Sequence, residues 1–180
     1  MNVFLIAAMS ADGFIGQDKN QPSLEWTSPE DKQFFANKTK QAGVVVMGRN
    51  TFATIGRPLS ERLTVVYTHC SKQELGQLLG SDLSQYRPDQ LQVTQLNPDQ
   101  LVEQLTQQGY GQLAVCGGAS IYSQFLQTDL VDELFLTIEP IMFGQGIRLS
   151  LEGLELRLKL KQTKQLNNQG TVLLNYQTKK

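Results

Sequence analysis

The sequence predicts an α/β fold with a mostly parallel central sheet, antiparallel C-terminal strands, and helices on both faces. Two observations carry this prediction. Short unbroken apolar runs alternate with helix-start signals as far as Leu126, as expected of parallel strands buried on both faces. Near the end of the chain, residues 154–160 and 171–176 alternate apolar and polar side chains around Asn167-Asn168-Gln169-Gly170, which indicates an antiparallel hairpin.

The first strand is predicted at Val3–Met9, an apolar run without a charged residue. Ser28, followed by a proline and two acids, has the residues preferred at a helix start: a hydroxyl cap, a proline at the first helical position and negative charge in the first turn. We expect this helix to direct Phe34 and Phe35 toward the sheet and to end near residues 42–43.

The next strand is predicted at residues 44–47, where the apolar run ends in a helix start. Gly48 permits a tight turn, and Arg49, Asn50 and Thr51 open a short helix. A helix start has unpaired N–H groups and partial positive charge, so these residues could hold a phosphate. We give equal weight to an ordinary strand–turn–helix joint, since such joints are common in α/β folds.

Further strands and helices complete the alternation. The strands are predicted at 63–68, 91–96, 113–116 and 133–138. One helix opens with Ser71-Lys72-Gln73-Glu74, a capping box in which the first and fourth side chains pair with backbone N–H groups, and Asn97-Pro98-Asp99-Gln100 caps the start of another. A third helix follows Gly117-Gly118 and takes up Ile121, Tyr122, Phe125 and Leu126.

The composition is that of an ordinary globular protein of 180 residues, 40% hydrophobic and 18% charged, which we interpret as a single domain over residues 1–180. A net charge of −1 gives no reason to expect nucleic acid or an anionic membrane as a partner. No apolar run approaches transmembrane length. Cys70 and Cys116 make no metal-ligand spacing, so we expect no metal site and, by default, a reducing cytoplasm.

In a sheet of this type the ligand lies outside the carboxyl ends of the strands. Four features of the sequence fall there: the loop 8–16, the turn 48–51, Thr68-His69 and Gly117-Gly118. Paired glycines let a flat or anionic ligand approach the backbone, although a Gly-Gly turn is about as often a packing turn. The sequence lacks the glycine patterns of Rossmann and phosphate-binding loops, the nucleophile elbow and zinc spacings.

Asp31 is the leading candidate for handling a proton. An acid in the first turn of a helix usually does no more than interact with the helix dipole. If its side chain instead faces a cleft beside Trp26 and Phe35, the loss of solvation would raise its pKa and let it hold a proton.

Arg57 and Arg62 offer two cations near the short helix. One of them could grip a carboxylate with two guanidinium nitrogens, while the other could stack on the surface. His69 alone is more often a surface or hydrogen-bonded histidine than a catalyst. Cys116 is most simply a small buried apolar residue.

Together these segments resemble dihydrofolate reductase and its sister family, the reductase domain of riboflavin biosynthesis, over nearly the whole chain. The matching stretches are residues 6–16, beginning Ile6-Ala7-Ala8-Met9; Met47-Gly48-Arg49-Asn50-Thr51-Phe52, continuing through 55–62; and Gly117-Gly118-Ala119-Ser120-Ile121-Tyr122. The resemblance implies the dihydrofolate reductase-like fold, NADPH as the cofactor, and a small-molecule substrate.

The resemblance also implies catalytic roles. Asp31 matches the carboxylate that hydrogen-bonds the pteridine ring and assists its protonation, Thr137 the threonine that supports this contact, and Trp26 the tryptophan of a mobile loop. Arg62 matches the arginine that binds the glutamate carboxylate of folate. The implied substrate-binding residues are Ile6, Ala8, Asp31, Phe35, Ile55, Arg57, Leu59, Arg62 and Thr137.

For the cofactor, the resemblance places the nicotinamide end beside Ala8 and Ile15. Arg49, Thr68 and His69 fall near the adenosine 2′-phosphate, which favours NADPH over NADH. The implied cofactor-binding residues are Ala8, Ile15, Gly16, Gly48, Arg49, Asn50, Thr51, Thr68, His69, Cys116, Gly117, Gly118, Ala119, Ser120, Ile121 and Tyr122.

Departures from the dihydrofolate reductase pattern leave the substrate open. The Pro-Trp pair of that family is broken here into Pro22-Ser23-Leu24-Glu25-Trp26, which implies a longer mobile loop. Residues 139–146 and 170–176 resemble the riboflavin-pathway domain more closely. Because that domain tends to form dimers, both a monomer and a homodimer remain open.

Three functional hypotheses follow. The leading one is an NADPH-dependent oxidoreductase of one-carbon metabolism that transfers a hydride to a pteridine, reducing 7,8-dihydrofolate to tetrahydrofolate. The alternative is reduction of a diamino-ribosylamino-pyrimidinone phosphate of riboflavin biosynthesis, with Arg57 or Arg62 on the phosphate. The third is a nucleotide-binding protein without turnover, against which the presence of Asp31, Thr137 and Trp26 together argues.

Overall fold

The computed structural model describes residues 1–18, 21–149 and 155–179. Its strands are β1 (Asn2–Ser10), β2 (Phe14–Gly16), β3 (Val44–Gly48), β4 (Leu63–Tyr67), β5 (Leu91–Thr94), β6 (Gln112–Val115), β7 (Val131–Glu139), β8 (Ile147–Arg148), β9 (Leu158–Gln165) and β10 (Val172–Thr178). Its helices are the short 3-10 helix η1 (Ser23–Glu25), α1 (Pro29–Ala42), α2 (Arg49–Ile55), α3 (Lys72–Leu79), α4 (Pro98–Gln107) and α5 (Ala119–Leu126).

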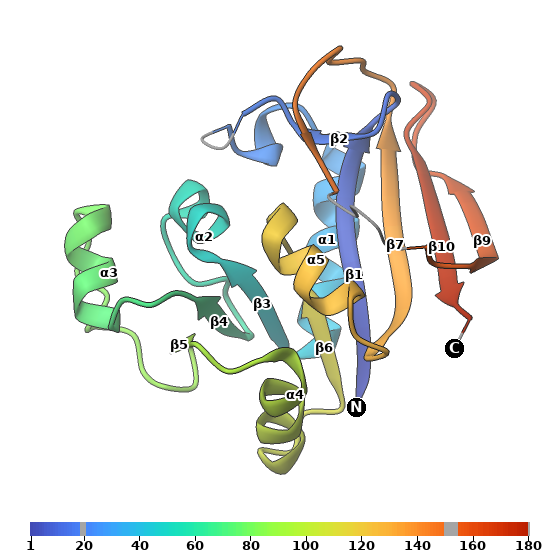
Figure 1. Cartoon of the computed structure of the whole chain (residues 1–180). Coiled ribbons are helices and arrows are strands. Elements are labelled where there is room, and N and C mark those ends of the chain that lie inside the picture. The colour runs from blue at the N-terminus through green and yellow to red at the C-terminus, as the bar shows by residue number, and fades with distance from the viewer. Residues whose placement is uncertain (19–20, 150–154, 180) are drawn as a thin grey trace.

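Within these residues the main sheet has eight strands in the order β5-β4-β3-β6-β1-β7-β10-β9, and it runs through the centre of the molecule (Figure 1). The strands from β5 to β7 in this order pair in parallel. β10 is antiparallel to β7, and β9 is antiparallel to β10. The predicted sheet, mostly parallel with antiparallel C-terminal strands, is therefore confirmed.

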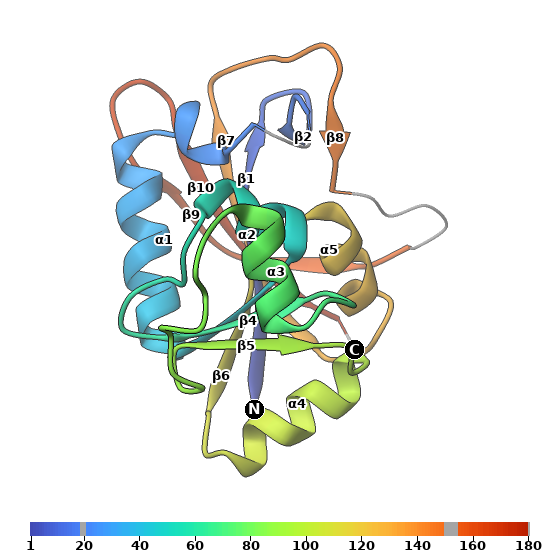
Figure 2. The same cartoon turned by 90° about the vertical axis from the view of Figure 1, so that its left-hand side faces the viewer.

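Alternate residues of the central strands point into two separate cores. Val3 and Leu5 of β1 pack with residues of α4 and α5. Phe4 and Ile6 belong to a second cluster, which includes residues of α1, α2 and α3. Figure 2 shows α1 on one side of the sheet and α4 and α5 on the other. Helices thus cover both faces, as predicted, and this accounts for the unbroken apolar runs of the strands.

The helix ends predicted from capping residues are also confirmed. The hydroxyl of Ser28 accepts a hydrogen bond from the backbone N–H of Asp31 at 3.2 Å, and both capping boxes, at residues 71–74 and 97–100, are formed. α1 ends at Gly43, whose φ of +73° is a conformation that glycine adopts at little cost. None of the helices in the described residues combines the length and apolarity needed to cross a membrane.

One predicted strand was misplaced. Of the prediction at 154–160, residue 154 lies outside the described residues, 155–157 form no strand, and β9 begins only at Leu158. β9 is an exposed strand at the edge of the sheet, held by pairing with β10, so burial imposes no alternation on its polar second half. The small antiparallel sheet of β2 and β8 was not predicted, because such short strands show no pattern.

Candidate active site

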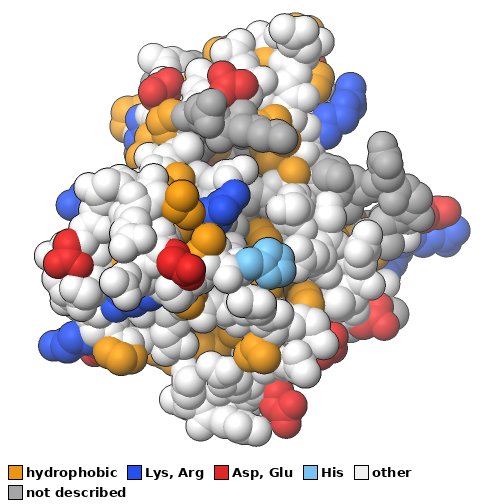
Figure 3. Space-filling view, turned by 60° about the vertical axis from the view of Figure 1, so that its left-hand side comes forward, with side chains coloured by type: hydrophobic (Ala, Val, Ile, Leu, Met, Phe, Trp, Pro, Cys, Tyr) orange, Lys and Arg blue, Asp and Glu red, His pale blue; other side chains and the backbone are white. Residues whose placement is uncertain are grey.

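A cleft of about 1250 Å³ opens near the carboxyl ends of the parallel strands β1, β3, β4, β5 and β6. Its walls come from these strand ends, the starts of α1, α2 and α5, and the loop 21–27. His69, the one histidine of the sequence, is exposed at the cleft and is the pale blue side chain in Figure 3. The four features that the sequence placed at this end of the sheet all line the cleft.

Glycines bring two backbone turns close together at one end of the cleft. The N–H of Gly48 donates to the carbonyl of Gly117 at 2.7 Å, and Gly117 is joined to Gly118 by a cis peptide bond. Gly117 has a φ of +103°, and a Cβ there would lie 2.9 Å from the hydroxyl of Tyr122. A Cβ on Gly118 would lie 3.3 Å from Oγ1 of Thr51. Side chains at these positions would fill space or strain the backbone, so glycine keeps this end of the cleft open.

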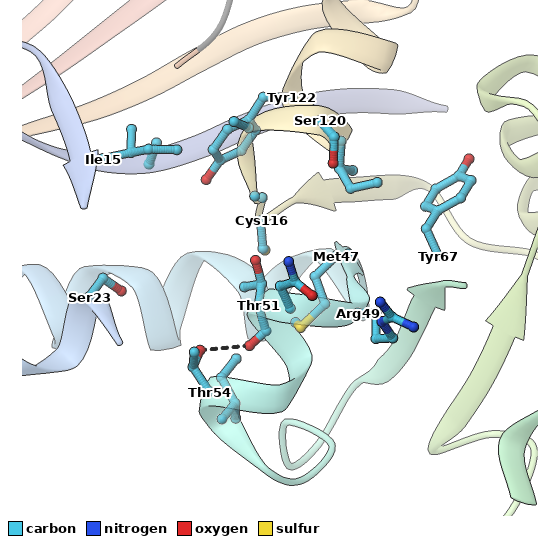
Figure 4. Close-up of a pocket in the computed structure, with 18 of the residues that line it drawn as sticks. Ile15, Ser23, Met47, Arg49, Thr51, Thr54, Tyr67, Cys116, Ser120 and Tyr122 are labelled. Atoms are coloured by element: carbon cyan, nitrogen blue, oxygen red, sulfur yellow. Dashed lines mark hydrogen bonds between the residues drawn. The ribbon is translucent and has the colours of Figure 1, made fainter. Parts of the chain in front are cut away.

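Two helices start at this end of the cleft, and neither has a side-chain cap. The residues that precede α2 and α5 are Gly48 and Gly118, whereas α1, α3 and α4 are each capped by a side chain. Uncapped N–H groups and the helix dipole favour an anion at such a start. Figure 4 shows Arg49 and Thr51 of α2 and Ser120 of α5 around the same space.

Tyr67, the last residue of β4, is a cleft residue that was not predicted to bind a ligand. Its ring packs edge-on against Phe125, with the ring centroids 6.3 Å apart. Its hydroxyl is buried without a hydrogen-bond partner among the described residues, and burial raises its pKa to about 12. Figure 4 shows Tyr67 and Ile15 at opposite ends of the view. Because an unpaired buried hydroxyl is costly, a bound ligand is the natural source of its missing partner.

Asp31 lies in the first turn of α1, where it lines the cleft and is only 8% exposed. Burial raises the pKa of its carboxyl group, and a hydrogen bond with the Thr137 side chain lowers it. The negative charge of Glu139 raises the pKa and the positive charge of Lys32 lowers it, with a net result above the ordinary value. Asp31 thus has the partly desolvated environment that a proton-handling carboxylate requires.

Arg62 also lines the cleft and is held by backbone and side-chain acceptors. Its Nε donates to the carbonyl of Ser60 at 2.9 Å, and its Nη1 donates to the carbonyl of Ala36 at 3.2 Å and to the hydroxyl of Thr39. These α1 residues follow Asp31 by five and eight positions, or roughly 8–12 Å along the helix axis. No partner of Nη2 is found within the described residues, so this nitrogen can bind an anionic group.

Three of the implied site residues do not line the cleft. Arg57 is exposed beyond Gly56, whose φ of +75° turns the chain out of α2. Trp26 packs edge-on against Phe143 with ring centroids 5.1 Å apart, so its ring belongs to the contact between two loops. Thr137 is 1% exposed and reaches the cleft only through its bond to the aspartate carboxyl group. We therefore do not retain Arg57 as a substrate-binding residue.

All the other implied residues come together in the cleft. Those that the resemblance implied for the substrate are Ile6, Ala8, Asp31, Phe35, Ile55, Leu59 and Arg62. Those that it implied for the cofactor are Ala8, Ile15, Gly16, Gly48, Arg49, Asn50, Thr51, Thr68, His69, Cys116, Gly117, Gly118, Ala119, Ser120, Ile121 and Tyr122. Segments that are far apart in the sequence thus form one continuous surface.

Glu139 is a residue beside the site whose role was not predicted. It is the last residue of β7, is 3% exposed, and accepts hydrogen bonds from the backbone N–H of Ser28 and the hydroxyl of Thr171. No pattern in the sequence marked this acid as inward. The structure shows that positions 135, 137 and 139, which share one face of the strand, are all buried. An acid at such an inward position requires partners, which only the structure identifies.

A carboxylate also ties together the loops at the mouth of the cleft. Asp12, in the loop after β1, accepts hydrogen bonds from the backbone N–H groups of Phe143 at 3.1 Å and of Gly144 at 2.7 Å. The pairing of β2 with β8 joins the same two loops, and Ile15 and Ile147 from these strands line the cleft. The loop after β1 is therefore held by the loop after β7 at several points.

These features fit a phosphorylated dinucleotide. The uncapped starts of α2 and α5 and the nearby Arg49 suit phosphate groups, and the glycines allow close backbone approach. The Tyr67 hydroxyl has no hydrogen-bond partner in the part of the chain that the structure describes. Among the residues that the structure describes, no three His, Cys, Asp or Glu side chains are grouped to hold a metal ion.

Comparison with known proteins agrees with this geometry. Residues 2–172 match the family described as the RibD C-terminal domain. A curated relative, dihydrofolate reductase type A13 of Escherichia coli, is 44% identical over 66 residues, which cover 37% of this chain and 38% of that protein. The match therefore spans well under half the length of this relative.

Two solved structures resemble the whole chain. A protein from Shewanella sp. PV-4, assigned provisionally to riboflavin biosynthesis, aligns over 100% of both chains with a TM-score of 0.79 and 20% identity. Dihydrofolate reductase from Enterococcus faecalis, complexed with NADP(H) and RAB-propyl, aligns over 99% of this chain and 97% of its own with a TM-score of 0.66 and 21% identity. At these identities the two structures show a shared dihydrofolate reductase-like fold.

Proposed function

The chain belongs to the RibD C-terminal domain family, within the dihydrofolate reductase-like superfamily, and from this premise we propose that it is a reductase that uses NADPH to convert 7,8-dihydrofolate to tetrahydrofolate. The observation that carries this proposal is that the partly desolvated Asp31 and the anchored Arg62 line one cleft. A flat amino-substituted ring with an anionic tail needs an acceptor at one end and a cation at the other.

Asp31 would bind the ring. Its two carboxylate oxygens can accept hydrogen bonds from an amino group and an adjacent ring N–H, as pteridines present them. Because its pKa is raised, Asp31 can share a proton with the ring closer to neutral pH than an exposed aspartate could. Water would deliver the proton to the ring nitrogen. Proton handling by a positioned group typically contributes about 10²- to 10⁴-fold to a rate.

Arg62 would bind the tail. Its Nε and Nη1 are engaged by the protein, which fixes the guanidinium while Nη2 can meet a carboxylate. Phe35, Ile55 and Leu59 line the cleft and would pack against the body of the substrate. These apolar side chains would also exclude water, which strengthens the polar contacts at both ends.

NADPH, when bound, supplies the hydride, and the task of the protein is to hold the two rings face to face in a dry cleft. Ala8 and Ile15 would lie beside the nicotinamide, and the starts of α2 and α5 would hold the pyrophosphate. Arg49, Thr68 and His69 would surround the 2′-phosphate. A cation and two hydrogen-bonding side chains there would favour NADPH over NADH.

A second candidate substrate is a diamino-ribosylamino-pyrimidinone phosphate of riboflavin biosynthesis. The family match and the resemblance to the Shewanella structure favour it. Its ring also offers amino and N–H groups to Asp31, but its anion is a phosphate on ribose instead of a carboxylate tail. Arg62 would then hold the phosphate, since Arg57 is exposed and does not line the cleft.

The test is NADPH consumption by the purified protein with dihydrofolate, run beside the same assay with the pyrimidine. We expect turnover of dihydrofolate that methotrexate blocks, because a tight-binding folate analogue fits only the pteridine site. Turnover of the pyrimidine alone would assign the second substrate and a phosphate to Arg62. NADPH binding with neither substrate reduced would refute both and leave a nucleotide-binding protein without turnover.

A further inference from the structure

Glu139 is an acid placed inside the protein. Its Oε1 accepts from the backbone N–H of Ser28 at 2.7 Å, and its Oε2 accepts from the hydroxyl of Thr171 at 2.7 Å. The Thr171 hydroxyl also accepts a hydrogen bond from Nδ2 of Asn167 at 3.0 Å, so its own hydrogen is free to be donated to Glu139. Neither donor to Glu139 carries a charge, so these bonds solvate its negative charge without neutralising it.

These bonds place Glu139 at the junction of three elements. It ends β7, Ser28 caps α1, and Thr171 directly precedes β10. The Ser28 hydroxyl accepts from the backbone N–H of Asp31 at 3.2 Å. Glu139 is therefore linked through Ser28 to the backbone of Asp31.

A second residue of β7, Thr137, also contacts Asp31. Thr137 is two positions before Glu139, so both side chains lie on one face of the strand, and the Thr137 side chain hydrogen-bonds the Asp31 carboxyl group. One strand thus holds the side chain of Asp31 through Thr137 and its backbone through Ser28. The negative charge of Glu139 comes close enough to act on the Asp31 carboxyl group.

The charged and titratable groups around Asp31 differ in their effects. Burial of Asp31 is the largest influence on its pKa and raises it; the charge of Glu139 from β7 also raises it, and Lys32 on α1 lowers it. From α5, the Tyr122 hydroxyl comes within electrostatic range of Asp31, but it is neutral because burial raises its own pKa well above the usual value. Arg62 lines the same cleft from the loop before β4. Glu139 is thus the negative charge in this set that opposes ionisation of Asp31.

We propose that Glu139 is a positioning residue for Asp31: its hydrogen bonds fix the start of α1 against β7 and β10, and so hold the Asp31 carboxyl group at the cleft. The consequence for catalysis rests on the proposed function, in which Asp31 shares a proton with the substrate ring. The link between the two acids is a property of the ligand-free protein and needs no substrate.

The test is a carboxyl ¹³C NMR titration of Asp31, its resonance identified by its absence from the Asp31→Asn variant. Glu139→Gln removes the charge but keeps the size of the side chain and an oxygen for the Ser28 N–H. We expect the Asp31 midpoint to move to lower pH in this variant. An unchanged midpoint would overturn the proposal.

Glu133→Gln is the matched control. Glu133 lies on the same face of β7, is paired with Lys161 at 3.2 Å, and is about 20 Å from Glu139 along the strand. The substitution changes the net charge by the same amount, so it should leave the Asp31 midpoint unchanged. An equal shift in both variants would show a general charge effect and refute a specific role for Glu139.

A measurement on the unmodified protein keeps the proposal testable even if the Glu139→Gln variant does not fold. The charge that forms on Asp31 changes the electric field at the nearby carboxyl carbon of Glu139, so the Cδ resonance of Glu139 should shift at the Asp31 midpoint. Absence of that shift would also overturn the proposal.

Measuring turnover distinguishes a failure of this inference from a failure of the proposed function. We expect Glu139→Gln to lower kcat for dihydrofolate at neutral pH by about two- to tenfold with the Kd for NADPH unchanged, a smaller loss than removal of the proton-handling group itself. A shifted Asp31 midpoint in a protein that reduces no pteridine would refute the proposed function alone. Full turnover with an unshifted midpoint would refute the role of Glu139 alone.

Discussion

Replacing Asp31 by asparagine should make the protein more stable at neutral pH while making it a poorer enzyme. Burial raises the pKa of Asp31 above its ordinary value of 3.8, so the folded protein binds this proton more tightly than the unfolded chain does. The contribution of Asp31 to stability is therefore fully present below the unfolded pKa and is lost as the pH rises through the folded pKa. Asparagine carries no charge and avoids this loss.

The magnitude follows from the same shift. Each pH unit by which the folded pKa exceeds 3.8 corresponds to about 1.4 kcal/mol of stability that the wild type lacks at neutral pH. The helix dipole has the opposite effect on Asp31, because it stabilises an ionised acid in the first turn by about 0.3–1 kcal/mol. Burial outweighs it, because the net shift is upward. The amide oxygen of asparagine can still pair with the Thr137 side chain, so no unpaired group is created.

The assay is urea unfolding of both proteins between about pH 3 and pH 8, with turnover of dihydrofolate measured in parallel. Near pH 3 the two proteins should have about the same free energy of unfolding. As the pH rises, the variant should become progressively more stable than the wild type. Turnover at neutral pH should fall by about 10²- to 10⁴-fold with little change in NADPH binding. A variant that is less stable than the wild type at neutral pH, or a difference that does not depend on pH, would refute the reasoning.

Three further substitutions test other parts of the site. Gly117→Ala should lower the free energy of unfolding, measured in urea, by about 2–4 kcal/mol, because the φ of Gly117 is +103° and a Cβ there would lie 2.9 Å from the buried hydroxyl of Tyr122. Gly111→Ala is the control, because a Cβ at Gly111 would meet no described atom within 4 Å. Arg62→Gln should raise the KM for dihydrofolate about 10- to 100-fold in steady-state kinetics, whereas Arg57→Gln should not. Tyr67→Phe should not destabilise the ligand-free protein but should weaken NADPH binding by about three- to tenfold in calorimetry. Equal costs at the two glycines, an unchanged KM in Arg62→Gln, or full NADPH affinity in Tyr67→Phe would contradict these expectations.

Local signals in the sequence were enough to predict most of the fold. Helix starts at Ser28, Ser71 and Asn97 depend on side chains that bond within three residues, so their caps can be recognised from adjacent residues alone. The central strands were recognisable because burial on both faces requires apolar residues throughout. β9 was misplaced for the converse reason, since an exposed edge strand is held by its backbone partner.

The features of the site that the sequence did not indicate depend on contacts between distant segments. Trp26 is held by Phe143 from the loop after β7, and Glu139 acts on Ser28, 111 residues earlier in the chain. Arg57 follows a recognisable motif, but the turn at Gly56 directs the chain toward solvent. Pairings of this kind have no local pattern, so the sequence indicated which residues line the cleft better than it indicated what holds the cleft together.

The central claim is that this cleft transfers a hydride from NADPH to a pteridine ring. The most direct measurement is to give the purified protein dihydrofolate with NADPH that carries deuterium at the transferable position, and to weigh the product by mass spectrometry. We predict tetrahydrofolate that contains one deuterium, formed far more slowly by the Asp31→Asn variant. Unlabelled product, or NADPH that binds while dihydrofolate remains unreduced, would contradict the claim.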